Sequence, residues 1–247
     1  MKNVDNGGGR WLDVSAERFP GWIASFARRH GVTAPAGIAE EAGIVAGAED
    51  LAVTVEGAIV TFTAPDGAVA QCHPPFNESL AGLRPAGTGL ASTAPAAVAE
   101  TIAAHARTPR TVGVLLVRLG GYAAGVFTGY PPELADAKAG ARPVHGRSAA
   151  GGWSQQRFAR RREKQANEAL EAAANTAVSI FGRAPRLDAV VLGGDKRAMA
   201  ELRGDPRLAR YLALATERFL TVPDPKRGVL LDTPRLFTAV RIRLTEP

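Results

Sequence analysis

The sequence predicts an α/β (α+β) fold: a mixed β-sheet flanked by helices, with an exposed loop leading into one long helix, preceded by a small N-terminal α+β unit. Two observations support this class. In the second half of the chain, short apolar runs that suit buried strands alternate with amphipathic helical stretches. In the first half, short strands separated by turn residues follow a single helical stretch.

Composition divides the chain into four segments. The first segment is polar and rich in glycine, so we expect a flexible tail there. The third is rich in Gly, Pro, Ser and Thr, which is typical of a connection, and it ends in a helix. The expected segments are a tail at 1–9, the small α+β unit at 10–79, the connection and helix at 80–110, and a larger domain at 111–247.

The first unit is expected to contain one helix and three strands. Apolar residues spaced three and four apart predict a helix over 15–29. Alternating apolar and polar residues, interrupted by the turn signals Glu56-Gly57 and Pro65-Asp66-Gly67, predict a hairpin and a further strand. These strands are expected at 51–55, 58–63 and 68–72.

The remaining elements follow from apolar runs and breakers. Gly120-Gly121 separates two strands, and Pro131-Pro132 ends the second of them. The last strand is expected to complete the larger sheet in the order β-β-loop-α-β-α-α-β. Helices are expected at 96–106, 154–181, 195–202 and 206–215, and strands at 111–119, 122–128, 187–192 and 236–244.

The most informative stretch is the loop and helix start at 142–165. It carries seven Lys or Arg residues against one acid, Glu163. On a helix, Arg157, Arg161 and Lys164 fall on one arc with Arg160 beside it, opposite an apolar face. A charged face is most simply a solvated surface. The near-absence of acids three or four residues away favours a polyanionic partner, because unpaired like charges repel one another.

The composition of the whole chain is consistent with a polyanionic partner but does not establish one. The net charge is +6 over 247 residues, with a pI near 10.0. A single cysteine, Cys72, allows no internal disulfide, and no apolar run is long enough to cross a membrane. The N-terminus lacks the features of a secretory signal. We therefore expect a cytoplasmic, monomeric protein without a membrane association.

The residues at 151–156 have properties that suit a site in a narrow cavity. Gly151 and Gly152 allow close approach to a ligand, and Trp153 offers a flat ring for stacking on a nucleobase. The amides of Gln155 and Gln156 can donate to a developing oxyanion and accept from a water. From the residues alone, the simpler interpretation is a polar helix start with Trp153 as a packing anchor.

The sequence gives little support for a metal site, a nucleotide-binding site or a nuclease site. The four histidines are scattered, and neither a phosphate-binding loop nor a dinucleotide fingerprint occurs, so we expect no metal and no cofactor. Gly193-Gly194 is most simply a turn between a strand and a helix. A nuclease that uses two metal ions would need carboxylates that converge, and the candidates are Asp188, Asp195 and Asp232. We interpret these three aspartates instead as solvated acids in turns.

The order of elements and the segment HGRSAAGGWSQQRFARRRE resemble a known family. From about 111 to 244, the chain is similar to the catalytic middle domain of eukaryotic and archaeal class-one peptide chain release factors. It is more similar still to the release-factor-like domain of the peptidyl-tRNA hydrolases of ribosome-associated quality control, in its actinobacterial branch. Release factors carry Gly-Gly-Gln in this loop, and alignment on 157–160 places Trp153 at the glutamine. The quality-control relatives carry G-x-x-Q, which 152–155 satisfies.

The resemblance implies a role in ribosome rescue: release of nascent peptides from tRNA on stalled ribosomes. It implies Gln155 as the catalytic glutamine, with Gln156 as second choice, acting at the tRNA CCA end in the peptidyl transferase centre of the large subunit. It also implies RNA contacts, with Trp153 facing the nucleotides. The RNA backbone would be held by Arg157, Arg160, Arg161 and Lys164, and the loop braced by Arg142, His145 and Arg147.

Two alternatives stay open. The same loop could serve an endonuclease that cuts the tRNA near its CCA end. The basic helix could equally belong to a non-catalytic module that binds RNA or the ribosome. No codon-reading domain is recognisable in the sequence, which favours rescue over ordinary termination.

Overall fold

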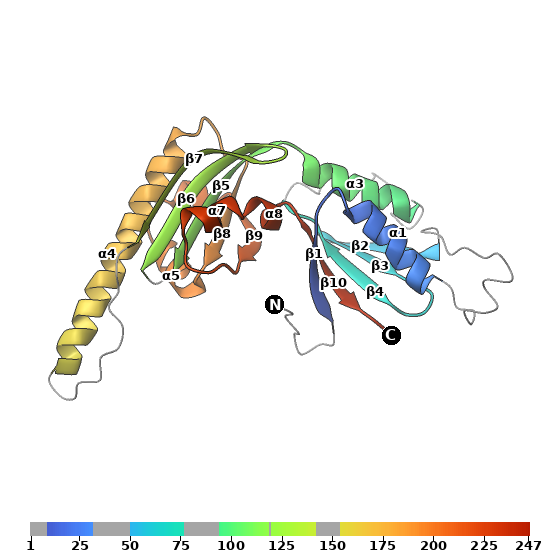
Figure 1. Ribbon diagram of the computed structural model, residues 1–247, viewed down its shortest axis with the longest axis horizontal. Coiled ribbons are helices and arrows are strands. Elements are labelled where there is room, and N and C mark those ends of the chain that lie inside the picture. Colours follow the sequence, from blue (N-terminus) through green and yellow to red (C-terminus); the bar gives the residue numbers. More distant parts are fainter. Residues whose placement is uncertain (1–8, 32–49, 77–93, 119, 142–153) are drawn as a thin grey trace. The chain divides into compact units, whose positions relative to one another are not determined.

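The computed structural model describes residues 9–31, 50–76, 94–118, 120–141 and 154–247, with 154–163 described as helix backbone only. The chain forms two compact units, each with its own sheet. The first comprises 1–108 together with 238–247, and the second comprises 109–237. The predicted mixture of sheets and flanking helices is confirmed (Figure 1).

The first unit is an antiparallel sheet in the order β1-β10-β4-β3-β2. Its helices α1 (Phe19–His30) and α3 (Pro95–Arg107) pack into one core on a single face of that sheet. Each helix has a proline at its first or second position, where a missing N–H costs nothing. The strands are β1 (Arg10–Val14), β2 (Ala52–Glu56), β3 (Ile59–Thr63), β4 (Val69–His73) and β10 (Val240–Thr245).

The prediction that the last strand completes the larger sheet was wrong. β10 pairs antiparallel with β1 on one side and with β4 on the other. Its inward residues Val240, Ile242 and Leu244 are buried with α1 and α3. Alternation along a strand shows that one face is buried, but it does not identify the neighbouring strands, which are distant in sequence. The final strand of the domain expected at 111–247 therefore belongs to the first unit.

The second unit is a mixed sheet in the order β7-β6-β5-β8-β9. β5 pairs antiparallel with β6 and parallel with β8, so the prediction of a mixed sheet is confirmed. One core joins this sheet to α4, α5 and α6. Its strands are β5 (Arg110–Arg118), β6 (Gly121–Gly129), β7 (Glu133–Ala141), β8 (Ala189–Gly194) and β9 (Ala215–Leu220), and its helices α4 (Ser154–Arg183), α5 (Lys196–Leu202), α6 (Ala209–Leu212), α7 (Arg227–Leu231) and α8 (Pro234–Phe237).

Three strands were not predicted: β1, β7 and β9. β7 reads ELADAKAGA, in which small residues replace the β-branched and aromatic residues that mark a strand. It lies at the edge of the sheet and is mostly exposed. β1 and β9 also lie at sheet edges, where pairing with a neighbour contributes more than hydrophobic alternation does. The helix expected at 206–215 is the shorter α6, because Ala215 already begins β9.

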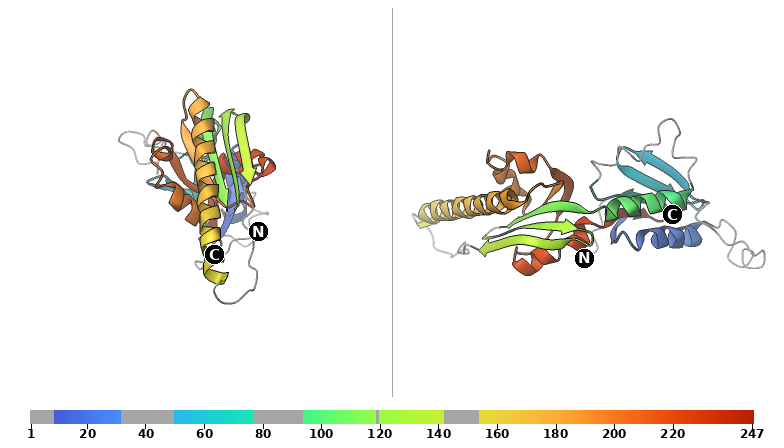
Figure 2. Two further views of the ribbon diagram at one scale, coloured as in Figure 1. Left: turned by 90° about the vertical axis from the view of Figure 1, so that its left-hand side faces the viewer. Right: turned by 90° about the horizontal axis from the view of Figure 1, so that it is seen from above.

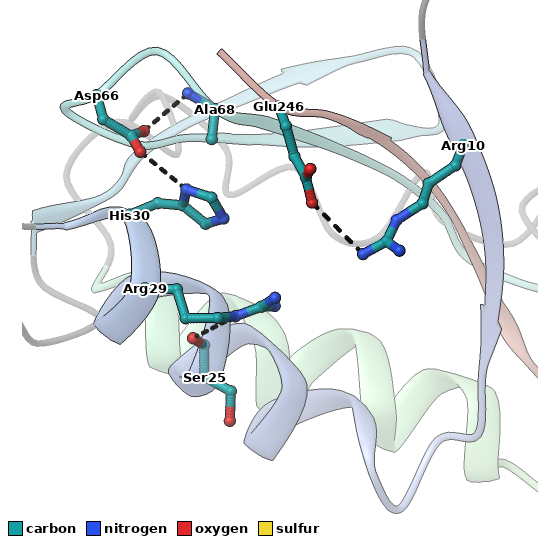
Figure 3. A network of polar contacts seen from close by, with 7 residues as sticks. All are labelled: Arg10, Ser25, Arg29, His30, Asp66, Ala68 and Glu246. Atoms are coloured by element: carbon teal, nitrogen blue, oxygen red, sulfur yellow. Dashed lines mark hydrogen bonds and ion pairs between the residues drawn. The ribbon is translucent and has the colours of Figure 1, made fainter.

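A polar cluster joins the end of α1 to the turn between β3 and β4 (Figure 3). His30 Nδ1 donates to Asp66 Oδ2 at 2.8 Å, and the Ala68 N–H donates to Asp66 Oδ1 at 2.9 Å. Burial raises the pKa of Asp66, but the hydrogen bonds from Ala68 and His30 together outweigh it, so the pKa lies below its usual value. Within the described residues, no helix is long and apolar enough to span a membrane.

Replacing Ile242 tests the central position of β10. Ile242 is fully buried, so Ile242→Ala leaves a cavity and is expected to lower the free energy of unfolding by about 2–5 kcal/mol. Urea denaturation followed by circular dichroism measures the effect. The matched control is Thr54→Ala on exposed β2, for which a change below about 0.5 kcal/mol is expected. Equal effects of the two changes would contradict the packing described.

Asp66 is expected to make the fold sensitive to acid. Because its pKa is lowered in the folded protein, the carboxylate stabilises the fold above its ordinary pKa of about 3.9. This contribution is lost as the pH falls through the lowered value. Between pH 5 and pH 2.5, the wild type should therefore lose more stability than Asp66→Asn in urea denaturation. Parallel pH profiles for the two proteins would rule out this role.

Candidate functional site

The predicted long helix is confirmed as α4, which begins at Ser154 as expected and runs for 30 residues. Gln155 and Gln156 lie in its first turn, where backbone N–H groups have no partner within the helix. The helix dipole makes this end electropositive, and its first turn contains no acid. The two candidate glutamines thus lie at the end of a helix that favours an anionic ligand.

The first turns of α4 extend beyond the sheet that carries the helix (Figure 1). Among its described side chains, the first that is buried is Ala169. At 1.5 Å per residue, the 15 residues from Ser154 to Ala169 place the helix start about 22 Å from that position. The left view of Figure 2 shows the same extension along the helix axis. The backbone of the first turns of α4 therefore lies beyond the packed part of the helix.

The two faces of α4 agree with the predicted pattern where side chains are described. Ala173 and Ala177 are fully buried against the sheet, and Leu170 is partly buried. Lys164, on the predicted cationic arc, is exposed. Arg157, Arg160 and Arg161 lie on the helix, and their positions follow from its periodicity alone. The rest of the predicted site lies outside the described residues: Arg142, His145, Arg147, Gly151, Gly152 and Trp153.

Two polar contacts brace the second half of α4. Arg183 donates from Nε and Nη2 to Asp136 Oδ2 on β7, at 2.7 and 2.6 Å. Arg207 Nη1 donates to Asn175 Oδ1 at 2.6 Å, while the rest of its guanidinium binds Asp205. The Arg207 hydrogen bonds lower the pKa of Asp205. Sequence reasoning missed these braces because their partners are far apart in sequence and no periodicity links them.

The three aspartates considered for a metal site have separate local roles. Asp188 accepts from the Thr111 N–H at 2.8 Å. Asp195 caps α5, accepting from the N–H groups of Arg197 and Ala198. Asp232 lies at the end of α7 beside Arg235. A search of the described ranges finds no group of three or more His, Cys, Asp or Glu residues arranged to hold a metal ion.

Gly193 and Gly194, expected to form a turn between a strand and a helix, are instead the last residues of β8, and the helix α5 follows almost directly. Gly194 has φ +103°, a conformation that favours glycine, and a Cβ there would collide with the Val117 carbonyl oxygen. The next residue, Asp195, is the N-cap of α5, which begins at Lys196. These glycines allow β8 to lie close to its neighbouring strands, since a Cβ at Gly193 would also collide with the Leu220 carbonyl oxygen of β9.

A family model matches residues 110–243, more than half of the chain, from the start of β5 into β10. Its description is "Actinobacteria/chloroflexi VLRF1 release factor". The chain belongs to this family. The matched range contains all of α4, including the two glutamines and the cationic arc. The expected resemblance to release factors is therefore confirmed for this VLRF1 family member.

Solved structures also resemble the chain, at low identity and low TM-score. An archaeal translation termination factor, aRF1, is 13% identical, with 89% of this chain and 61% of that chain covered and a TM-score of 0.34. The Vms1 mitochondrial localization core is 9% identical, with coverages of 74% and 75% and a TM-score of 0.34. Archaeoglobus fulgidus Pelota is 10% identical, with coverages of 95% and 64% and a TM-score of 0.26.

The chain therefore spans about three fifths of the archaeal termination factor that it resembles. A search of curated proteins gave no match.

Enlarging a buried alanine tests how α4 is held. Ala173 is fully buried, so Ala173→Leu would force the helix away from the sheet and is expected to lower the free energy of unfolding by about 1–3 kcal/mol. The control Asn167→Leu, at an exposed position of the same helix, should change it by less than about 0.5 kcal/mol. Urea denaturation compares the two, and equal costs would contradict the assigned buried face.

Proposed function

We propose that this VLRF1 family member is a peptidyl-tRNA hydrolase that frees nascent peptides from tRNA on stalled ribosomes. The observation that carries the proposal is the family match, which spans the helix bearing Gln155. A release factor acts on the ester between a peptide and the tRNA 3′ end. The residues that precede and begin α4 have the chemistry such a reaction requires.

The reaction needs a positioned water and stabilisation of a developing negative charge. Water attacks the ester carbonyl carbon, the bond to the tRNA 3′ oxygen breaks, and that oxygen receives a proton, leaving a peptide acid and an intact tRNA. A neutral glutamine amide can accept a hydrogen bond from the water and donate one to the carbonyl oxygen. We assign this role to Gln155, which the G-x-x-Q pattern favours, and take Gln156 as the alternative.

The cations of α4 are proposed to hold the RNA. Arg157, Arg160, Arg161 and Lys164 lie within three turns of the candidate glutamines on a helix with an electropositive start. Arginine and lysine contacts to phosphate position a protein on RNA without reading its sequence. Together with Arg142, His145, Arg147 and Trp153, they would guide the loop glycines, Gly151 and Gly152, to the CCA end in the large subunit.

Replacing the catalytic glutamine tests the reaction. Gln155→Ala is expected to slow peptide release from stalled large-subunit complexes by about 10²–10³-fold, the usual cost of losing one oxyanion donor. Binding to those complexes should be unchanged. The matched control is Gln156→Ala, the adjacent amide, for which release should stay within a few-fold of wild type. The measurement is the rate at which labelled peptide leaves the tRNA.

The tRNA product separates hydrolysis from its alternatives. Hydrolysis leaves an intact 3′ CCA end, which gel sizing and sequencing detect. A shortened tRNA would mean that the protein is an endonuclease. Binding without turnover in the wild type would mean a non-catalytic RNA-binding module. Full activity of both glutamine variants would exclude the proposed mechanism.

A further inference from the structure

The sheet of the first unit has a second face, opposite the core formed with α1 and α3. Alternation along β1, β10 and β4 directs Leu12, Ile242 and Cys72 toward that core. The intervening side chains lie on the opposite face, where each is exposed or partly exposed. We call this set the outer face: Trp11, Asp13, Gln71, His73, Arg241 and Arg243.

Three strands bring an aromatic and cationic cluster together on the outer face. Arg241 Cζ lies 4.3 Å from the ring centroid of Trp11, within cation–π range. The Trp11 and His73 rings are 5.3 Å apart between centroids and tilted by 55°. In the sheet register, Arg241 lies opposite His73, and Trp11 lies opposite Arg243. The guanidinium of Arg241 is therefore held over a ring rather than extended into solvent.

The chemistry of this cluster favours one kind of ligand. The six outer-face residues include two arginines and one acid, Asp13, which is opposite Arg241 in the register, so this described set carries a net positive charge. A groove for an apolar peptide would need a row of exposed aliphatic side chains, whereas Val69, at the start of β4, is the one aliphatic residue among the described outward residues of β1, β10 and β4. Flat rings and a guanidinium plane stack on nucleobases, and arginines bind phosphates. A single-stranded nucleic acid satisfies both features, whereas a duplex hides its bases.

We propose that the outer face is a binding platform for single-stranded RNA, separate from the catalytic loop and α4. A base would stack on the layer formed by Trp11 and Arg241, with the ring of His73 alongside it. Arg243, whose side chain lies against the backbone of Gly9, would contact the neighbouring phosphate. The platform goes beyond the proposed hydrolysis, since it would attach the first unit to exposed RNA while the second unit acts on the ester.

The test uses the full chain and a fluorescein-labelled, mixed-sequence RNA of 12 nucleotides, followed by fluorescence anisotropy. Because the cations of α4 are also expected to bind RNA, each variant is made in a background with Arg157, Arg160, Arg161 and Lys164 changed to Gln. Trp11→Leu removes the stacking ring, and Trp11→Phe retains one. Arg241→Gln removes the stacked guanidinium, and Arg243→Gln removes the charge proposed to contact phosphate. The matched control is Arg107→Gln on α3, an exposed arginine of the same unit that lies outside the outer face.

The expected results separate stacking from charge. Trp11→Leu should weaken RNA binding about tenfold, Trp11→Phe only slightly, and Arg107→Gln not at all. Arg241→Gln should also weaken binding, because it removes the guanidinium from the stacking layer. Arg243→Gln should reduce the slope of log affinity against log salt by about 0.7, as expected for one lost phosphate contact. Trp11→Leu should leave that slope unchanged. Circular dichroism and urea midpoints verify that each variant is folded.

Several outcomes would overturn the platform. Equal RNA affinity in Trp11→Leu, Arg241→Gln and Arg107→Gln would do so, as would binding of duplex RNA as tightly as single-stranded RNA. Binding of poly-glutamate as tightly as RNA would indicate a surface for an acidic protein. Gln155→Ala should leave the oligonucleotide affinity unchanged. A negative result in the peptide-release assay would therefore not change the RNA affinities measured here. Likewise, unchanged RNA affinity in the outer-face variants would not change the result of the peptide-release assay.

Discussion

The packing of α4 on its sheet through small side chains is the constraint on which the second unit depends. Ala169, Ala173, Ala174 and Ala177 are buried, and alanine at the contact lets the helix backbone approach the strands closely. The polar braces, at Asn175 and Arg183, lie in the same half of the helix. The packing and bracing contacts described for α4 thus lie in its second half. Because α4 is one continuous helix, the packing of its second half also determines where the backbone of its first turn lies.

The sequence was informative where a residue pattern acts locally. Periodicity predicted α4 and its start, and apolar runs predicted β5, β6 and β8, because these features depend on neighbours in the chain. It failed where long-range pairing decides. β7 is rich in alanine and is a strand because β6 provides partners for its backbone, and β10 lies between β1 and β4 rather than in the larger sheet. In the candidate site, the positions of Gln155 and Lys164 on the helix could be predicted, whereas the braces at Asp136 and Arg207 could not.

The path of the chain links the two units by covalent structure. After building the second unit, the chain returns to place β10 between β1 and β4, so the first sheet is complete only when both ends of the sequence are present. This arrangement also creates the outer face, because Arg241 and Arg243 arrive from the C-terminal end to meet Trp11 from the N-terminal end. A family model that begins at residue 110 includes these arginines but not the ring beneath one of them. The cluster is therefore a property of the whole chain.

The form of α4 also bears on where the proposed chemistry can occur. Oxyanion donors are most effective where water is excluded and the local dielectric is low. The start of α4 lies about 22 Å from the first buried side chain described on that helix, beyond the packed part that could provide such surroundings. Under the proposed function, the amide would gain them only when the helix is enclosed by RNA, where the cations of α4 replace solvent as partners of the phosphates. Under this proposal, the extension of α4 beyond its sheet is what would allow the glutamines to enter a cavity in a partner. The chain thus supplies the positioned amide and the charge, and the ribosome would supply the enclosure.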